Sequence, residues 1–310
     1  ECMATGSGGF FPAPVDEALV VDPAELPQQE RGRAEAGEDG LDEVHADEGA
    51  EQQPPRADEV GEGEPEQVHG AGEEADEAFE SHVREVLFFD TEDFALYRNH
   101  FIFRLRTNYK GGWPDGIPEV TFKFRHPEFE KAAAVDVRPV ASGGIARIKF
   151  KAEFLPVRET LGGMRSIFSH NCVLAKPRED LDMAVKDLAA AFPAVGVLEA
   201  SHDSPLRLVN DLAVEEVQVN VGELHFGNGF NGKTTIAVWR TRKYEKAFCG
   251  EFAFQCKFDS EDDLHKSSLR RADDFYKALQ LEAHDWVSLG TTKTALVYQI
   301  GQPAHATRSE

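Results

Sequence analysis

The stretch HFIFRLR, residues 100–106, alternates apolar and basic side chains, and three later stretches repeat the pattern: EVTFKFR (119–125), RIKFKAEF (147–154) and IAVWRTR (236–242). Because the side chains of a β-strand point alternately to opposite faces, each stretch predicts a strand with its charges on one face. Four such strands would form one cationic surface. Its basic residues would be Arg104, Arg106, Lys123, Arg125, Lys149, Lys151, Arg240 and Arg242. Such a surface would attract a polyanion.

Acidic residues are concentrated near the N-terminus. Residues 1–80 hold 24 Asp and Glu against three Arg and no Lys, whereas residues 81–310 hold 32 acids and 30 bases. A stretch with so many charges and so few apolar residues cannot bury enough surface to offset the conformational entropy that it would lose on folding. We therefore expect residues 1–80 to be mostly disordered and 81–310 to form the folded domain. Because the chain begins at Glu1, the alternative is that the acidic stretch is truncated or translated in the wrong frame.

Several classes of protein are disfavoured by the composition. No apolar run reaches the roughly 18 residues of a membrane span, and no signal sequence is apparent, so we expect a cytoplasmic protein without membrane contact. The four cysteines show no CxxC spacing, which disfavours a disulfide framework or a zinc site. The nearly neutral charge of residues 81–310 argues against nucleic-acid binding, because such modules are usually basic.

Beyond residue 83 the sequence predicts a β-rich α+β domain. Further strands are expected at 83–90, 134–140, 214–222, 250–258 and 294–300, and helices at 178–192 and 260–283. Alternating βαβ units are missing, so the sheet is expected to be mostly antiparallel, either open or closed into a barrel. In a sandwich the charges would face water, whereas in an eight-stranded barrel covered by helices they would line the bore. The recurrence of charged residues at one phase of nearly every strand favours the bore.

A second phosphate-binding pattern occurs at residues 227–234, GNGFNGKT, which matches the P-loop motif letter for letter. In a P-loop, Lys233 would reach the outer phosphates of a nucleotide. A P-loop is followed by a helix, yet TTIAVWRTR is β-branched and aromatic with a period of two. The Gly and Asn residues are also typical of a hairpin turn. We favour the hairpin and keep P-loop nucleotide binding as the alternative.

The run VLFFDTEDFALYRNHFIFRLR (86–106) resembles the second and third strands of the CYTH, or triphosphate tunnel, superfamily. There an aromatic residue, FDT, a leucine and R-x-R follow one another in that order. EVTFKFR looks like the next strand. The strand ending in WRTR, the strand GEFAFQCKF (250–258) and the segment GTTKTALVY (290–298) are similar to the family's later strands and its closing lysine segment.

This resemblance implies an eight-stranded antiparallel tunnel that binds a small triphosphate through inward Lys and Arg. Such proteins hydrolyse inorganic, nucleoside or thiamine triphosphates with Mg²⁺ or Mn²⁺ held by glutamates. The expected phosphate contacts are Arg104, Arg106, Lys123, Arg240 and Lys293, with Arg125, Lys149, Lys151 and Arg242 beside them, and the expected metal ligands are Glu251 and Glu216. A homodimer through the covering helices is also implied. No residue is predicted to act as nucleophile, acid or base.

Two departures from the family pattern keep a second function open. The family opens with a strand carrying E-x-E-x-K, and no such strand is recognisable between residues 1 and 83. Ala253 also stands where a second acid would support Glu251. Because Mg²⁺ and Mn²⁺ prefer several oxygen ligands, the alternative is a non-catalytic module that binds phosphate or polyphosphate.

Overall fold

The computed structural model describes residues 15–21, by their backbone, and residues 79–301 except for 141–145, 178–181, 243–245 and 259–262. The chain divides into two units, one made of Glu1–Leu26 with Asp76–Glu310 and the other of Pro27–Ala75. All the described residues belong to the first unit. None of the helices among them is long and apolar enough to span a membrane.

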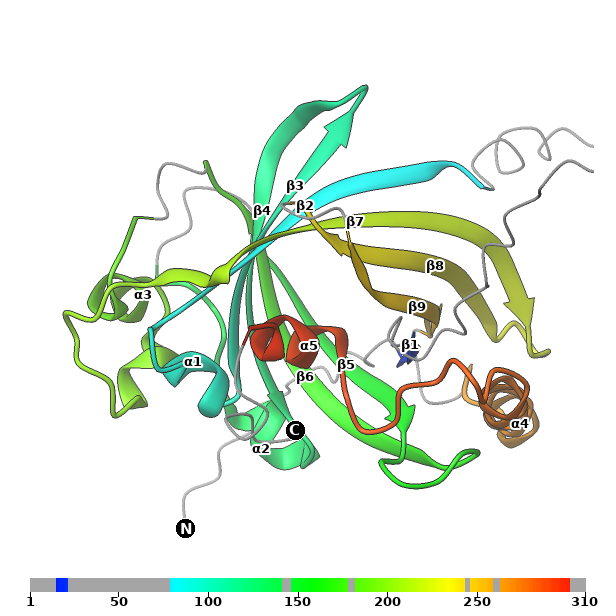
Figure 1. Cartoon of the computed structure of the whole chain (residues 1–310). Coiled ribbons are helices and arrows are strands. Elements are labelled where there is room, and N and C mark those ends of the chain that lie inside the picture. The colour runs from blue at the N-terminus through cyan, green and yellow to red at the C-terminus, as the bar shows by residue number, and fades with distance from the viewer. Residues whose placement is uncertain are drawn as a thin grey trace, which may run out of the picture. The chain divides into compact units, whose positions relative to one another are not determined.

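The first unit is built around a closed β-barrel in which the strands follow the order β1-β5-β6-β4-β3-β2-β7-β8-β9 (Figure 1). The strands are β1 (Val15–Val21), β2 (Ser81–Asp90), β3 (Phe101–Lys110), β4 (Trp113–His126), β5 (Arg147–Pro156), β6 (Met164–Ala175), β7 (Arg207–His225), β8 (Asn231–Thr241) and β9 (Ala247–Cys256). Every pair of neighbours is antiparallel except β1 with β5. The prediction of a mostly antiparallel barrel with helices is therefore confirmed.

Strand β1 lies within the N-terminal segment that was expected to be disordered. Its residues Val15–Val21 pair with β9 from Cys256 to Gly250, and its first three residues also pair with β5. The strand closes the ring between β5 and β9, where the sequence showed no recognisable first strand. VDEALVV contains only a four-residue apolar run, ALVV (18–21), and lies in an acidic stretch, so the composition of its surroundings concealed it. The other residues of 1–78 lie outside the described part of the chain.

The structure corrects two predicted elements and adds one strand that was not predicted. A strand was expected at 134–140, but helix α2 (Phe129–Ala134) occupies its start and irregular chain follows. The partner of β4 and β5 is instead β6, whose run MRSIFSHNCVLA has polar residues on its buried positions and so lacks clear alternation. The segment expected as a last strand is helix α5 (Lys293–Gln299), because the Thr292 side chain caps its first turn by accepting a hydrogen bond from Ala295 N at 3.1 Å.

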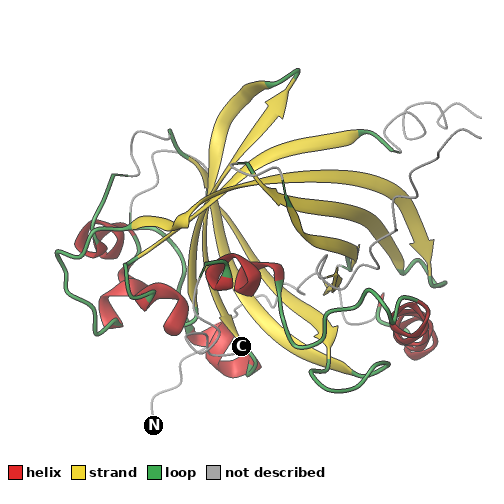
Figure 2. Cartoon of the chain, viewed as in Figure 1, coloured by secondary structure: helices red, strands yellow, loops and turns green. Residues whose placement is uncertain are grey.

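The remaining helices pack on the outer face of the barrel or at its ends (Figure 2). They are α1 (Ala95–Arg98), α3 (Val185–Ala191), the 3₁₀ helix η3 (Pro193–Val197) and α4 (Lys266–Glu282). The helices expected at 178–192 and 260–283 correspond to α3 and α4, both shorter than predicted.

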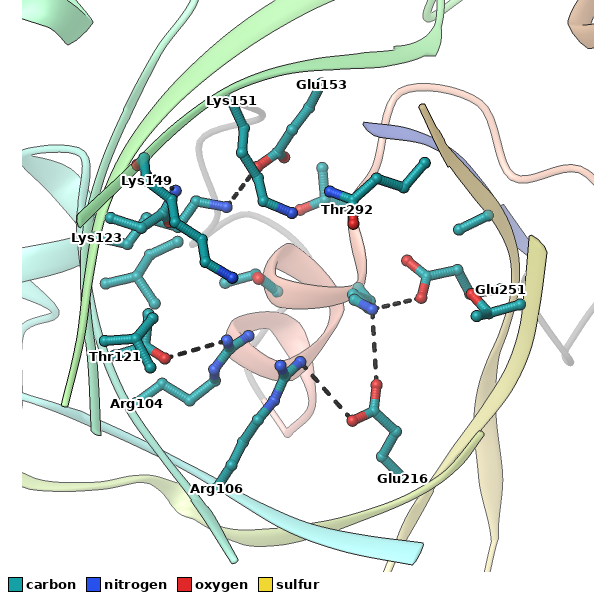
Figure 3. A pocket seen from close by; sticks show the side chains of 18 of the residues that line it. Arg104, Arg106, Thr121, Lys123, Lys149, Lys151, Glu153, Glu216, Glu251 and Thr292 are labelled. Atoms are coloured by element: carbon teal, nitrogen blue, oxygen red, sulfur yellow. Dashed lines mark hydrogen bonds and ion pairs between the residues drawn. The ribbon is translucent and has the colours of Figure 1, made fainter. Parts of the chain in front are cut away.

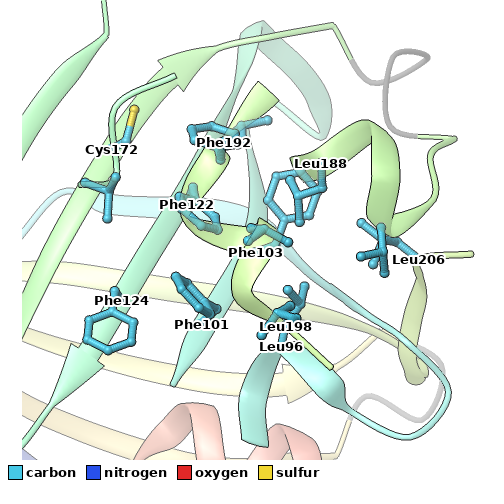
Figure 4. Packing of buried hydrophobic residues seen from close by; sticks show 14 of the residues in the cluster. Leu96, Phe101, Phe103, Phe122, Phe124, Cys172, Leu188, Phe192, Leu198 and Leu206 are labelled. Carbon is cyan, nitrogen blue, oxygen red and sulfur yellow. The ribbon is translucent and has the colours of Figure 1, made fainter. Parts of the chain in front are cut away.

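Two apolar clusters on opposite faces of the sheet position the site. On the outer face, Phe103 and Phe122 pack against α3 and η3, and Phe122 stacks on Phe192 with ring centres 4.3 Å apart (Figure 4). On the inner face, the cluster contains Phe88, Trp239 and Tyr298. Because Tyr298 belongs to α5, this helix fills one part of the bore with apolar side chains and leaves the polar part beside it as a cavity.

Candidate functional site: a cationic cavity in the barrel

A cavity of about 430 Å³ lies inside the barrel, and its lining is strongly basic (Figure 3). Ten basic side chains line it: Arg84, Arg104, Arg106, Lys123, Arg125, Arg147, Lys149, Lys151, Lys233 and Lys293. Four acidic side chains accompany them: Glu119, Glu153, Glu216 and Glu251. Among the described side chains, the lining thus holds six more basic than acidic groups. Because low-dielectric walls focus electric fields, such a cavity attracts anions.

Strand alternation explains how these charges reach the bore. On β3, Arg104 and Arg106 face the cavity, whereas Phe103 and Leu105 pack in the outer cluster. The neighbouring strand β4 repeats the arrangement, with Lys123 and Arg125 inward and its phenylalanines outward. Of the two alternatives left open by the sequence, the one in which charges line the bore is therefore correct.

The structure brings together seven of the nine predicted phosphate contacts and both predicted metal ligands. They are Arg104, Arg106, Lys123, Arg125, Lys149, Lys151 and Lys293, with Glu216 and Glu251.

Arg240 and Arg242 lie outside the cavity, which corrects their predicted placement. On β8, Lys233 and Thr235 line the cavity. Trp239, which points to the same face of the strand, belongs to the inner apolar cluster. Arg240 and Arg242 are therefore on the opposite face. There Arg240 Nε donates to Glu215 Oε1 at 2.6 Å, and an Arg242 NH group donates to Glu85 Oε2 at 2.7 Å.

The P-loop alternative is wrong. Residues 227–230 form the turn of the β7–β8 hairpin, in which Phe226 N donates to Phe230 O at 2.9 Å. Gly227 and Gly229 have φ of 82° and 74°, a conformation that glycine adopts without strain. The chain then continues as β8 and not as a helix, so Lys233 lines the cavity from a strand.

Five charged residues that line the cavity were not predicted to do so from the sequence. They are Arg84, Glu119, Arg147, Glu153 and Lys233, the last of which had been considered only as a P-loop lysine. Four of them lie at the inward phase of strands that had been recognised. Extending the alternation of VREVLFFD and EVTFKFR to every charged position would have found Arg84 and Glu119.

Glu153 neutralises two of the predicted phosphate contacts. Its Oε1 lies 2.5 Å from Lys123 Nζ and its Oε2 lies 2.8 Å from an Arg125 nitrogen, while Ser169 Oγ donates to Oε1 at 2.8 Å. Burial alone would raise the pKa of Glu153, but Arg125 and Lys123 outweigh it and hold that pKa below its ordinary value. Burial, and next the charge of Arg125, lower the pKa of Lys123 to about 7.

Glu216 is the centre of a second cluster of ions. An Arg84 nitrogen lies 2.8 Å from its Oε2, and the charged groups of Arg106 and Lys293 lie within 3.8 Å of its carboxylate. Trp239 Nε1 donates to Oε1 at 2.9 Å. Burial would raise the pKa of Glu216, but the charges of Arg106, Lys293 and Arg84 hold it below its ordinary value. Lys293 also forms an ion pair with Glu251.

Arg104 and Lys149 are cations of the cavity that lack a carboxylate partner among the described residues. Arg104 makes one long hydrogen bond, from a terminal nitrogen to Thr121 Oγ1 at 3.4 Å. Burial, and next the charge of Arg106, lower the pKa of Arg104. Burial, and then Lys151, lower the pKa of Lys149. Since these shifts reflect poor solvation and repulsion by neighbouring cations, an anion close to either group would be stabilised.

The predicted metal site does not fit the arrangement of its two glutamates. Both carboxylates are engaged by Lys293, and Ala253, the next inward residue of β9 after Glu251, supplies no oxygen ligand. In the described part of the chain, no group of three or more His, Cys, Asp and Glu side chains is arranged to hold a metal. Mg²⁺ is commonly held by one or two carboxylates together with waters and substrate phosphates, so what opposes a metal among the described side chains is that Lys293 already engages both carboxylates.

No protein-family model matches the sequence, and no curated protein matches it. Similar solved structures include a Hippeastrum protein described as a candidate adenylyl cyclase with a dominant triphosphatase activity, at 11% identity and a TM-score of 0.38 over 75% of this chain and 88% of that one. A candidate adenylate cyclase from Bacillus halodurans has 12% identity and a TM-score of 0.34, with 69% and 80% covered. The PH1819 protein of Pyrococcus horikoshii has 10% identity and a TM-score of 0.29, with 67% and 80% covered.

Because these identities and TM-scores are low, no property of those proteins is carried over to this chain. The strands and the cavity themselves define the class of protein: a closed, mostly antiparallel barrel whose bore is lined by Lys and Arg. That architecture agrees with the cationic, mostly antiparallel tunnel implied by the resemblance of residues 86–106 to the triphosphate tunnel superfamily, except that the barrel has nine strands among the described residues and not eight.

Proposed function

We propose that the cavity binds a short chain of phosphates, for which inorganic triphosphate is the simplest ligand. The observation that carries the proposal is Arg104, a guanidinium group inside the barrel that faces the cavity without a carboxylate partner among the described residues. A guanidinium group matches the geometry of phosphate oxygens, and the lysines around it act as point charges. The volume falls within the roughly 300–1,000 Å³ of small-molecule sites.

Hydrolysis of the bound chain, which the resemblance implies, stays a prediction. Phosphoryl transfer needs a positioned nucleophile and neutralisation of the phosphate charge, commonly with metal ions. The carboxylates that would hold such ions, Glu216 and Glu251, are occupied by Lys293. The geometry therefore supports binding better than turnover. Nucleoside and thiamine triphosphates carry the same phosphate chain, so they are candidate ligands of the same cavity.

The test is calorimetric titration of inorganic triphosphate into the full chain and into two arginine variants. Arg104→Gln should weaken binding by about tenfold or more, because a charge-assisted phosphate contact is lost. Arg240→Gln removes the same charge from the outer face and should leave the affinity unchanged. Absence of binding to the wild type, or equal losses in both variants, would contradict the proposal. Phosphate release measured in the same samples with Mg²⁺ and with Mn²⁺ tests turnover separately, with Lys123→Ala as the control.

A further inference from the structure

The two glutamates that were expected to hold a metal are both engaged by one ammonium group. Lys293 Nζ lies 3.8 Å from Glu216 Oε1 and forms a closer ion pair with Glu251 Oε2. In Figure 3, dashed lines from the labelled Glu216 and Glu251 meet at one nitrogen, which the two ion pairs identify as Lys293 Nζ. A positive charge that belongs to the chain itself thus lies between the acids from which a metal would take its oxygen ligands.

The surroundings of Glu216 oppose the entry of a further cation. Its side chain is only 1% exposed and also contacts Arg84 at 2.8 Å and Arg106 at 3.7 Å. A divalent ion at this carboxylate would have to displace Lys293 and would still lie close to two guanidinium groups. Repulsion between like charges is stronger in a protein interior than in water, so this position disfavours a metal.

The position of Lys293 is built into the fold. It is the first residue of α5, whose first turn is capped by Thr292. Further along the helix, Tyr298 stacks on Tyr97 with ring centres 4.1 Å apart, and its hydroxyl donates to Asp90 Oδ2 at 3.1 Å. The ammonium group also lies 5.0 Å from the ring centre of Trp239, a favourable distance for a cation–π contact.

We propose that Lys293 takes the place of a divalent metal in this cavity, so that the phosphate chain binds without one. This inference rests on the proposed function and adds that binding is independent of metal. The tethered ammonium group neutralises Glu216 and Glu251, and Arg104 and Lys149, which have no carboxylate partner among the described residues, are left to face the anion. Lys293 is then a specificity-determining residue, because it decides whether the free anion or its metal complex is the preferred ligand.

The first test uses the full wild-type chain and inorganic triphosphate, titrated in EDTA and then in Mg²⁺ or Mn²⁺. Binding in EDTA should be at least as tight as with metal, because Mg²⁺ competes for the anion in solution. Binding that occurs only with metal would overturn this inference while leaving the proposed function intact. Absence of binding under every condition would overturn both.

The second test measures Mn²⁺ binding without any anion, by the loss of the free-ion signal in electron paramagnetic resonance. The wild type should bind no Mn²⁺, whereas Lys293→Met removes the ammonium group between Glu216 and Glu251 and should gain measurable Mn²⁺ binding, weakened by the charges of Arg84 and Arg106 that remain beside Glu216. Lys233→Met is the matched control, since Lys233 lines the same cavity without an ion-pair partner in the described part of the chain. It should weaken the binding of the anion without creating a Mn²⁺ site.

Circular dichroism should show that both variants keep the wild-type fold. A wild type that already binds Mn²⁺, or a folded Lys293→Met protein that gains no Mn²⁺ binding, would contradict the assignment of this role to Lys293.

Discussion

Glu153 and Glu216 each face several cations, so the basic residues of the cavity differ in how far their charge is already neutralised. Lys123 and Arg125 share the carboxylate of Glu153, and Arg84, Arg106 and Lys293 surround that of Glu216. These carboxylates occupy the kind of position that an anionic ligand would take. Arg104 and Lys149 are outside both clusters, and we expect them to contribute most to the attraction of a phosphate chain.

If the cavity binds triphosphate as proposed, we expect Lys123 to make that binding depend on pH near neutrality. Burial and the charge of Arg125 lower its pKa to about 7, Arg104 acts in the same direction, and Glu153 opposes them. A bound phosphate chain favours the charged ammonium group and raises that pKa. Below pH 7 the lysine is protonated in both states, so it adds little further dependence of affinity on pH. Above pH 7 the free protein must take up a proton to bind, so the affinity for triphosphate should fall as pH rises from 7 to 9.

Calorimetric titrations of inorganic triphosphate at pH 6, 7, 8 and 9, in buffers of different ionisation enthalpy, measure both the affinity and the proton uptake. We expect a loss approaching tenfold per pH unit above 7, which is the limit for linkage to one proton. Lys123→Met should bind more weakly and with a flatter profile. A wild-type affinity that stays constant from pH 6 to 9 would contradict this role of Lys123.

At the scale of elements, the side chain of Asp90 joins the end of β2 to helices α1 and α5. Its Oδ1 accepts hydrogen bonds from Thr91 N at 2.8 Å and Leu96 N at 2.9 Å. Its Oδ2 accepts from Tyr97 N at 2.9 Å and from the Tyr298 hydroxyl at 3.1 Å. The carboxylate therefore holds in place the helix that presents Lys293 to the cavity.

Removing the carboxylate of Asp90 should lower the stability of the folded protein. Asp90→Ala leaves several buried donors without a partner and should lower the free energy of unfolding by about 2–4 kcal/mol. Tyr298→Phe removes only one hydroxyl and should cost about 1 kcal/mol. Urea denaturation of both variants and of the wild type measures which substitution lowers the free energy of unfolding more. If Asp90→Ala cost no more than Tyr298→Phe, Asp90 would not have the structural role described above.

The elements also show what sequence could predict. In HFIFRLR and EVTFKFR, apolar residues fill one phase and the basic residues all stand on the other. Arg104 and Lys123 were therefore predicted correctly to lie on one surface. IAVWRTR alternates as regularly, yet Trp239 belongs to the apolar part of the bore, so Arg240 points outward. Local alternation defines two faces but cannot say which of them is inside when both carry apolar residues.

Other failures came from tertiary packing that local sequence does not encode. TALVYQI has the residues of a strand, but it forms α5 because Tyr298 and Val297 fill the bore beside Phe88 and Trp239. Glu153 lies within a predicted strand. Its ion pair with Lys123 nevertheless forms only because β6 pairs with both β4 and β5 and brings the two strands close together. Since β6 was not predicted, neither was this ion cluster.

At the scale of the whole molecule, the negative net charge of the chain conceals a positive cavity. The chain carries −23, of which residues 81–310 contribute only −2, while the cavity holds six more basic than acidic side chains. Because the attraction is electrostatic, the affinity for inorganic triphosphate should fall as KCl is raised from low to high concentration. Titrations over a series of KCl concentrations measure the slope, and an affinity insensitive to salt would argue against binding through these charges.

The most direct test of the phosphate-binding cavity is a crystal structure of the protein grown with inorganic triphosphate. Density for the anion should lie within the barrel, with phosphate oxygens in hydrogen-bond contact with Arg104 and Lys149 and with Lys293 still on Glu216 and Glu251. Density for the anion on the outer face beside Arg240, or an empty barrel at saturating triphosphate, would contradict the central claim.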